Sequence, residues 1–396
     1  MKSQPLAGIT VLDFGQIYNG PYCGYLLAMA GARVIKVESP QGESLRGRAE
    51  TSSATYPFAM LNGNKEGITL DFKTDAGREL LQRLVTKADV LIENFSPGTM
   101  DRHGVGSDVL CKLNPRLIYA AGTGFGRTGP YRDYLAMDIT VQALSGIMAM
   151  TGDGDGPPLK AGVVICDFLG GIHLYAAIAT ALFARERSRE GCVVDVSMQD
   201  ATFPTLATAI GAMHFLGRHP DRVGNRHPAL ALAPYNVYRA SDGHVAIICI
   251  REGHWRSLVA AIGDPSLLED PRFADMTTRA VNMAAVDAAV EAWTSQHTRD
   301  EIFRITQAHD VICAPVQDLK AVLDDPHLYA RGSLRRVVDA KLGEIALPST
   351  PLRFEGLEPP DARPPPRLGA DNVAVYGELL GLSAEEVEGL RTRGIL

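Results

Sequence analysis

The chain passes from strand to helix and back to strand within residues 9–38, which read ITVLDFGQIYNGPYCGYLLAMAGARVIKVE. Ile9–Phe14 is a short apolar run rich in β-branched residues and lies between two glycines, as expected for a buried strand. Pro21 suits the start of a helix, so we expect a helix over Tyr22–Ala30. Arg33–Val37 is expected to be the next strand. Such a unit predicts two neighbouring parallel strands of one sheet.

The same alternation continues along the chain. A helix is expected over about Asp75–Ala88, where leucines recur at helical spacing. Strands are expected at Val90–Glu93 and Leu117–Ala121. Strands that alternate with helices predict an α/β fold with a doubly wound parallel sheet. The elements expected to follow are helices over Asp138–Met150, Asp167–Arg187 and Met198–Leu216, and a buried strand over Cys192–Val196.

The amino-acid composition changes near residues 217–228, where basic and turn-forming residues are frequent, and we place a domain boundary there. Beyond it, Tyr235–Arg239 and Val245–Ile250 flank a Ser-Asp-Gly turn and predict a β-hairpin. Helices are expected within 253–308, and a strand at Val311–Val316. Towards the C-terminus, residues 348–366 are proline-rich, which favours an extended linker. Ser383 with Glu386 is expected to form a capping box for the last helix.

Composition excludes several classes of protein. The 396 residues are 46% hydrophobic and 21% charged, which is ordinary for a soluble globular protein. A net charge of -7 argues against general nucleic-acid binding. The six cysteines form no CxxC pair, which fits a reducing compartment better than a disulfide framework. Residues 1–8 lack the apolar segment of a secretory signal, and the apolar stretches are too short to span a bilayer. We therefore expect a cytoplasmic protein without nucleic-acid or membrane partners.

Residues 124–129 read GFGRTG, which formally matches the GxGxxG dinucleotide fingerprint. That fingerprint should open a helix at once, but Pro130 and Tyr131 follow, so we disfavour a nicotinamide site. The sequence contains no HExxH, GxSxG or P-loop motif. What remains are acids at expected helix starts, Asp138 and Asp167, and such acids are most often caps or solvated charges. The residues alone therefore indicate an α/β enzyme of unknown reaction.

A series of short motifs, in order over nearly the whole chain, resembles one known family. None is specific alone, but their order and spacing make a chance match very improbable. The chain resembles the class III CoA-transferases, also called the CaiB/BaiF family, of which formyl-CoA:oxalate CoA-transferases are members. The motifs are Val11–Phe14, Gly20-Pro21, Gly31–Glu38, Asn64-Lys65, Thr69–Lys73, Val90–Gly98, Arg102, Gly124–Gly126, Gly129-Pro130, Asp138, Gly224–Pro228, Ala233–Tyr235, Ala314–Val316 and Leu368-Gly369.

This resemblance implies a fold and an assembly. A large Rossmann-like domain, residues 1–216, would be completed by a C-terminal tail, residues 331–396, that returns to it through a linker. A smaller α+β domain would occupy residues 217–330. Two such chains would form an interlocked, ring-like homodimer.

The resemblance also implies a reaction, transfer of CoA from an acyl-CoA donor to a carboxylic acid acceptor. The family's nucleophile is matched to Asp138. Its carboxylate would form first an aspartyl anhydride and then an aspartyl-CoA thioester, and this covalent route divides one difficult exchange into easier steps. CoA is here a substrate, and no tightly bound cofactor or metal is implied.

Matched positions imply a binding site for CoA. Thr123 and Ser39 stand where relatives can carry a basic residue, which removes those charges here. Arg226 and His227 are candidates for binding a second carboxylate of an acceptor. The residues matched to the CoA site are Ile17, Tyr18, Asn19, Leu70, Lys73, Asn94, Phe95, Ser96, Arg102, Thr123, Gly124 and Phe125.

Two alternatives remain open. Relatives that racemise 2-methylacyl-CoA esters need two acid/base groups, and they carry a His directly before the position of Asp138. Met137 stands there and cannot titrate, although Asp167, at the position of their other acid, is retained. The second alternative is a catalytically inactive CoA-binding protein. The donor and acceptor acids are not specified by the sequence.

Overall fold

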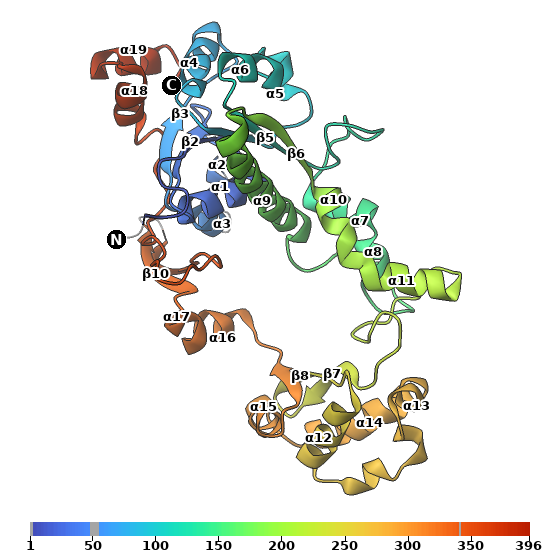
Figure 1. The fold of residues 1–396 in the computed structure, drawn as a ribbon. Helices are drawn as coiled ribbons and strands as arrows, with labels where there is room; N and C mark the ends of the chain where they lie inside the picture. The colour runs from blue at the N-terminus through green and yellow to red at the C-terminus, as the bar shows by residue number, and fades with distance from the viewer. Residues whose placement is uncertain (1–2, 48–54, 340–341) are drawn as a thin grey trace. The chain divides into compact units, whose positions relative to one another are not determined.

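The computed structural model describes residues 3–47, 55–339 and 342–396. Its main sheet has the strand order β3-β2-β1-β4-β5-β6, and every neighbouring pair is parallel (Figure 1). This is the doubly wound order, in which the chain reverses direction across the sheet between β1 and β4. The six strands are β1 Thr10–Asp13, β2 Arg33–Glu38, β3 Glu66–Thr69, β4 Val90–Glu93, β5 Ile118–Thr123 and β6 Cys192–Ser197.

Helices cover both faces of this sheet, and alternate strand residues point into two separate cores. Val11 packs with residues of α1 (Asn19–Met29) and α9 (Ile165–Ser188). Its neighbour Leu12 packs with residues of α4 (Asp75–Val85) and α6 (Ser107–Leu113). Burial on both faces explains why the central strands are almost continuously apolar. The predicted α/β class and parallel sheet are confirmed.

Helix α9 is long and apolar enough, by length and composition alone, to cross a membrane. Its buried residues Leu174, Ile178 and Leu182 pack in the same core as β1, β4 and β5. This packing is that of a helix in the core of the α/β unit.

Three predictions for this region are wrong in detail. The strand β6 was expected to be buried, but Cys192 and Val193 are exposed, because β6 is the edge strand of the described sheet and pairs there with β5. The helix expected over Asp138–Met150 is divided into α7 (Asp138–Ser145) and α8 (Ile147–Met150) by Gly146, whose φ is +94°. Likewise, α10 (Met198–Thr202) and α11 (Ala207–Leu216) are separated by a 3-10 turn that contains Pro204.

The chain forms two compact units, and the second consists of Gly146–Ala161 with Thr205–Asp324. The expected small domain began at residue 217 and ended at 330. Residues 146–161 belong to this unit because the Arg222 guanidinium donates hydrogen bonds to the carbonyl oxygens of Asp153, Gly154 and Gly156.

The second unit contains a three-stranded antiparallel sheet in the order β7-β8-β9. The predicted hairpin is confirmed as β7 (Tyr235–Ala240) and β8 (Gly243–Ile248), and β9 is Ile312–Pro315. One face of the sheet packs against helices through a core that includes Tyr238, Ile247 and Trp255. Besides α8 and α11, the helices of this unit are α12 Glu252–Ile262, α13 Met276–Val281, α14 Met283–Thr294, α15 Arg299–Ala308 and α16 Leu319–Leu323, with 3-10 turns at Pro265–Leu268 and Pro271–Phe273.

The C-terminal residues 325–396 belong to the first unit together with residues 1–145 and 162–204. A hairpin of β10 (Leu334–Asp339) and β11 (Gly343–Pro348), which the sequence analysis did not predict, is part of this segment. Residues 349–367, all within the described ranges, contain no helix or strand, as expected for the proline-rich stretch. The capping box at the start of α19 (Ala384–Thr392) is confirmed. The remaining helices are α2 Ser44–Gly47, α3 Thr55–Asn62, α5 Thr99–Arg102, α17 Pro326–Ala330 and α18 Asn372–Leu380.

Candidate active site

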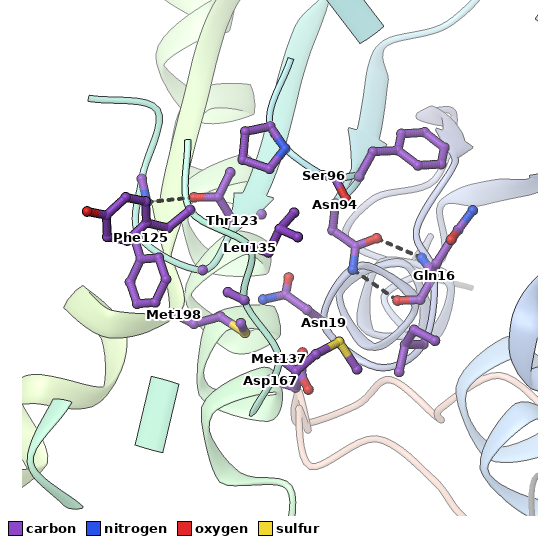
Figure 2. Close-up of a pocket in the computed structure, with 18 of the residues that line it drawn as sticks. Gln16, Asn19, Asn94, Ser96, Thr123, Phe125, Leu135, Met137, Asp167 and Met198 are labelled. Carbon is purple, nitrogen blue, oxygen red and sulfur yellow. Dashed lines mark hydrogen bonds between the residues drawn. The ribbon is translucent and has the colours of Figure 1, made fainter. Parts of the chain in front are cut away.

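A pocket of about 420 Å³ lies at the carboxyl ends of β1, β4 and β5, where the strand order reverses (Figure 2). Ligands of doubly wound sheets bind at this position, because the loops after neighbouring strands diverge there. Three segments supply most of the wall: the loop between β1 and α1, the loop after β4, and the loop between β5 and α7. The lining residues are Gln16, Ile17, Asn19, Asn94–Pro97, Thr99, Gly122–Gly126, Arg132, Tyr134–Met137, Asp167 and Met198.

The loop between β1 and α1 is held in a strained conformation. Ile17 has a φ of +65°, which is rare for a β-branched residue, and its N–H donates to the buried Glu43 carboxylate at 3.1 Å. The Asn94 side chain binds both backbone groups of Gln16, since Gln16 N–H donates to its oxygen at 2.7 Å and its amide donates to Gln16 O at 2.9 Å. The loop is therefore fixed before any ligand binds.

Buried charges support this loop from beneath. Lys65 and Asp13 form an ion pair at 2.7 Å, and both side chains are fully buried. Burial lowers the pKa of Lys65 to about 8, against the opposing effect of the Asp13 charge. The other Asp13 oxygen accepts from Gly15 N–H at 2.8 Å, and Lys36 donates to Gly15 O. Removing one partner of such a pair would leave a buried charge uncompensated.

The loop after β5 contains the glycine-rich stretch singled out in the sequence. A Cβ added at Gly124 would lie 2.1 Å from the Ala136 Cβ, so only glycine fits. The Thr123 hydroxyl accepts a hydrogen bond from Gly126 N–H at 2.8 Å, which closes a tight turn. The glycines here shape the pocket wall. The next described helix, α7, begins only at Asp138, which agrees with the expectation that these glycines do not open a dinucleotide-binding helix.

Two carboxylates, Asp138 and Asp167, occupy adjacent positions at this site. Asp138 Oδ1 accepts from Cys166 N–H at 2.8 Å and from Asp167 N–H at 3.3 Å, and its Oδ2 accepts from Gln142 Nε2 at 2.5 Å. Cys166 and Asp167 lie in the first turn of α9, whose N–H groups have no partners within the helix. Asp138 therefore caps α9, and both of its oxygens are engaged.

Asp167 has a different environment. Its side chain lines the pocket, whereas Asp138 is absent from the wall, and Asp167 is only 8% exposed. Burial, and then the neighbouring Asp138 charge, raises the pKa of Asp167 to about 7. The thiol of Cys166 stays protonated at neutral pH, because burial raises its pKa to about 11. The site thus combines one engaged carboxylate with one that titrates near neutral pH.

Most of the residues matched to the CoA site meet in this pocket. They are Ile17, Asn19, Asn94, Phe95, Ser96, Thr123, Gly124 and Phe125. Gln16, Leu135, Asp167 and Met198 line the same pocket but were not predicted as CoA contacts. Only the racemase comparison had drawn attention to Asp167. No local signal in the sequence marks Leu135 or Met198 as pocket residues.

The other matched residues lie outside the pocket wall. Leu70 is 2% exposed and belongs to the hydrophobic core, and Lys73 is on the surface. The Tyr18 ring packs against Phe168 with centroids 6.0 Å apart. Arg102 donates to Pro97 O at 2.9 Å and to the Thr99 hydroxyl at 3.0 Å, and so contacts two residues of the wall rather than the pocket itself.

The pair proposed for a second carboxylate has other partners within the second unit. Arg226 binds Asp287 at 2.8 Å, and Asp287 also accepts from Tyr238 and Asn236. The His227 ring packs edge-on against Tyr235 with centroids 5.3 Å apart, and desolvation lowers its pKa. Both residues stabilise their own loop in this structure.

In the part of the chain that the structure describes, no cluster of three or more His, Cys, Asp or Glu side chains has metal-binding geometry.

Comparison with known proteins identifies the family. The model of CoA-transferase family III matches residues 6–372. The acetyl-CoA:oxalate CoA-transferase of Acetobacter aceti is 38% identical over 96% of this chain and 97% of its own. The succinyl-CoA–D-citramalate CoA-transferase of Chloroflexus aurantiacus is 35% identical over 99% of this chain and 98% of its own. A crystal structure of a CaiB/BaiF family protein from Brucella suis, 35% identical, superposes with a TM-score of 0.84 over 96% of this chain and 100% of that one. The chain is therefore an enzyme that belongs to CoA-transferase family III.

Proposed function

We propose that this enzyme transfers CoA from an acyl-CoA donor to a carboxylic acid acceptor through a covalent intermediate on a pocket aspartate. Family membership supports CoA transfer itself. The observation that carries the covalent step is Asp167, a nearly buried carboxyl group in the pocket wall whose pKa is raised to about 7.

We assign the attack to Asp167, whereas the sequence analysis expected it from Asp138. The first reason is access, because Asp167 lines the pocket and Asp138 does not. The second is occupancy, because both Asp138 oxygens accept hydrogen bonds from Cys166, Asp167 and Gln142. Attack by Asp138 would require it to leave the N-terminus of α9. In this proposal Asp138 positions Asp167 and raises its basicity through its charge.

The chemistry needs no external proton donor. The Asp167 carboxylate attacks the thioester carbonyl carbon; a C–O bond forms, the C–S bond breaks, and CoA leaves as thiolate with the electron pair. The thiolate then attacks the Asp167 carbonyl of the anhydride, which releases the donor's acid and leaves an aspartyl-CoA thioester. The acceptor carboxylate repeats both steps in reverse. Desolvation suits this role, because a more basic carboxylate is a better nucleophile once it is ionised.

We further propose a dicarboxylic acid as acceptor. The two relatives compared above are named for oxalate and D-citramalate, and each of these acids carries two carboxylates. In this pocket Arg132 is a suitable partner for the second carboxylate. Its guanidinium is largely exposed, and within the described ranges its one ion pair is with the exposed Asp133, at 3.3 Å. Surface pairs of this kind contribute about 0–1 kcal/mol, so Arg132 can exchange partners at little cost.

The racemase alternative finds no support at the site. Met137 lines the pocket where a second titrating group would be required, and its thioether cannot carry a proton between two faces of a substrate. An inactive CoA-binding protein would have no need of a desolvated carboxyl group in the pocket, and burial of that group costs stability.

The assembly and location are also part of the proposal. Large apolar side chains are exposed on α9, where Phe183 is 66% exposed, and on α11, where Phe215 is 91% exposed. Exposed apolar surface of this kind supports the homodimer that the resemblance implies, with interlocked subunits. The six cysteines are all free, which supports a cytoplasmic location.

The test of the function compares Asp167→Asn with Asp138→Asn in an assay of CoA transfer between acetyl-, succinyl- or formyl-CoA and a panel of carboxylic acids, followed by mass spectrometry. Asp167→Asn should abolish transfer, because an amide has no anionic oxygen. Asp138→Asn should keep measurable transfer, because its side-chain oxygen still accepts from α9. Transfer by Asp167→Asn at the wild-type rate would refute the assignment.

A further inference from the structure

Asn19 has a buried side chain with unused hydrogen-bonding capacity. It is the first residue of α1, is 2% exposed, and lines the pocket. Neither its Oδ1 nor its Nδ2 has a hydrogen-bond partner among the residues that the structure describes. Each buried polar atom without a partner costs about 1–3 kcal/mol, so an amide in this state requires an explanation.

Two glycines make room for this amide. A Cβ at Gly122, in β5, would lie 2.4 Å from Asn19 Oδ1, and a Cβ at Gly170, in α9, would lie 2.3 Å from Nδ2. Any larger residue at either position would displace the amide. A glycine inside a helix costs about 0.5–1 kcal/mol relative to alanine. The unpaired amide, the glycine in β5 and the glycine in α9 are each unfavourable for stability, and all three meet at the Asn19 side chain. Unfavourable features that gather at one place are typical of a functional site.

Gly170 lies one helical turn beyond Asp167 on the same face of α9. The amide that packs on Gly170 therefore lies close to the carboxyl group to which we assign the attack, and Figure 2 shows both in one pocket. We propose that the Asn19 side-chain amide donates a hydrogen bond to the acyl oxygen while negative charge develops on it. This inference rests on the proposed function and adds a catalytic residue to it.

The step that this amide would assist is the formation of the tetrahedral intermediate. As the Asp167 oxygen bonds to the carbonyl carbon, the π electrons move to the acyl oxygen, and an N–H of Asn19 stabilises that oxyanion. The electrons return when the C–S bond breaks and CoA thiolate leaves. A donor that is already in place costs no reorganisation, and removal of one such donor slows acyl transfer about 10²–10³-fold.

The sequence analysis matched Asn19 to the CoA site, and the two roles predict different measurements. A residue that binds CoA contributes to the affinity for free CoA. A residue that binds the acyl oxygen does not, because free CoA has no acyl group. A purely structural role would instead change stability and leave the rate of acyl transfer unchanged.

The experiment uses Asn19→Leu, which matches the amide in shape, and Asn19→Ala as a smaller variant that cannot clash. Three quantities are measured: the single-turnover rate of adduct formation from acetyl-CoA, trapped with hydroxylamine; the Kd for free CoA; and the Tm. We expect the rate to fall about 10²–10³-fold in both variants, the Kd to stay within about threefold, and the Tm of Asn19→Leu to rise, because an unpaired polar group is removed.

An unchanged rate in variants that fold, or an increase in Kd that accounts for the whole loss of activity, would overturn the role of Asn19. Failure of the proposed function is a separate outcome, because it would show as the absence of any trapped adduct in the wild-type enzyme.

Discussion

Asp138 Oδ1 accepts a hydrogen bond from the backbone N–H of Asp167 at 3.3 Å, so one acid holds the helical turn that carries the other. The charge of Asp138 adds to burial in raising the pKa of Asp167. Two neighbouring carboxyl groups therefore differ in role: one is fixed by hydrogen bonds, and the other is desolvated and faces the pocket. Environments that divide paired acids in this way are typical of catalytic sites.

The pH dependence of catalysis follows from this pair. The kcat/KM for an acyl-CoA should rise with a midpoint near pH 7, because Asp167 attacks only when it is ionised. In Asp138→Asn the neighbouring charge is absent, so the midpoint should move to lower pH. The measurement is a pH–rate profile of both proteins. A midpoint that stays in place in Asp138→Asn would mean that the Asp138 charge does not act on the attacking group.

Stability should depend on pH through Asp167. Its pKa is raised from 3.8 to about 7 in the folded state. The folded state therefore binds this proton more tightly, and the resulting contribution to stability, complete below pH 4, is lost as the pH rises through 7. Asp167→Asn cannot ionise and should be more stable than wild type at pH 8, by at most about 4 kcal/mol, and equally stable near pH 4. Urea unfolding at the two pH values measures this, and an equal difference at both would contradict the pKa shift.

Arg102 should affect binding more than turnover. Its hydrogen bonds to Pro97 and Thr99 shape the part of the pocket wall that follows β4, whereas Asp167 lies on α9. Arg102→Ala should raise the KM for acyl-CoA about tenfold and change kcat less than twofold, since such contacts act equally on the ground state and the transition state. The exposed Arg391→Ala on α19 serves as the control for loss of a surface cation. A collapse of kcat at constant KM would give Arg102 a role in the chemical step.

The dimer should not separate on dilution, because interlocked subunits cannot dissociate without opening. The exposed Phe183 and Phe215 motivate this expectation, since a monomer would leave both in water. Sedimentation velocity from micromolar to low nanomolar concentration should show one species with twice the mass of the chain. A reversible monomer in that range would exclude interlocked subunits.

The fold was largely predictable from the sequence because its signals are local. Short apolar runs predicted β1, β2 and β4 to within two residues, and the capping box predicted the start of α19. The β10–β11 hairpin was not predicted, because Arg335 and Arg336 interrupt the apolar residues of β10 and the sequence between the two strands has no Asn-Gly or Asp-Gly pair. The division of α7 from α8 depends on the left-handed conformation of Gly146, which composition does not reveal.

The loops that form the site were predictable from the sequence, but the role of each residue within them was not. Asp138 and Asp167 read alike in sequence, since each stands in the first turn of a helix. Which of them faces the pocket depends on how α7 and α9 pack, and that is a tertiary property. Asn94 lines the pocket, and its amide binds the Gln16 backbone, a pairing that no pattern in the sequence marks.

The most direct test of the account is to trap the covalent intermediate and find which residue carries it. The enzyme is incubated with an acyl-CoA donor alone, then treated with hydroxylamine or borohydride, digested, and mapped by mass spectrometry. An aspartyl anhydride or thioester reacts with these reagents, whereas free carboxylates do not. The account predicts modification of Asp167 alone, in a donor-dependent manner, and none in Asp167→Asn. Modification of Asp138 instead would return the nucleophile to the position expected from the sequence, and no modification of either aspartate would contradict covalent transfer.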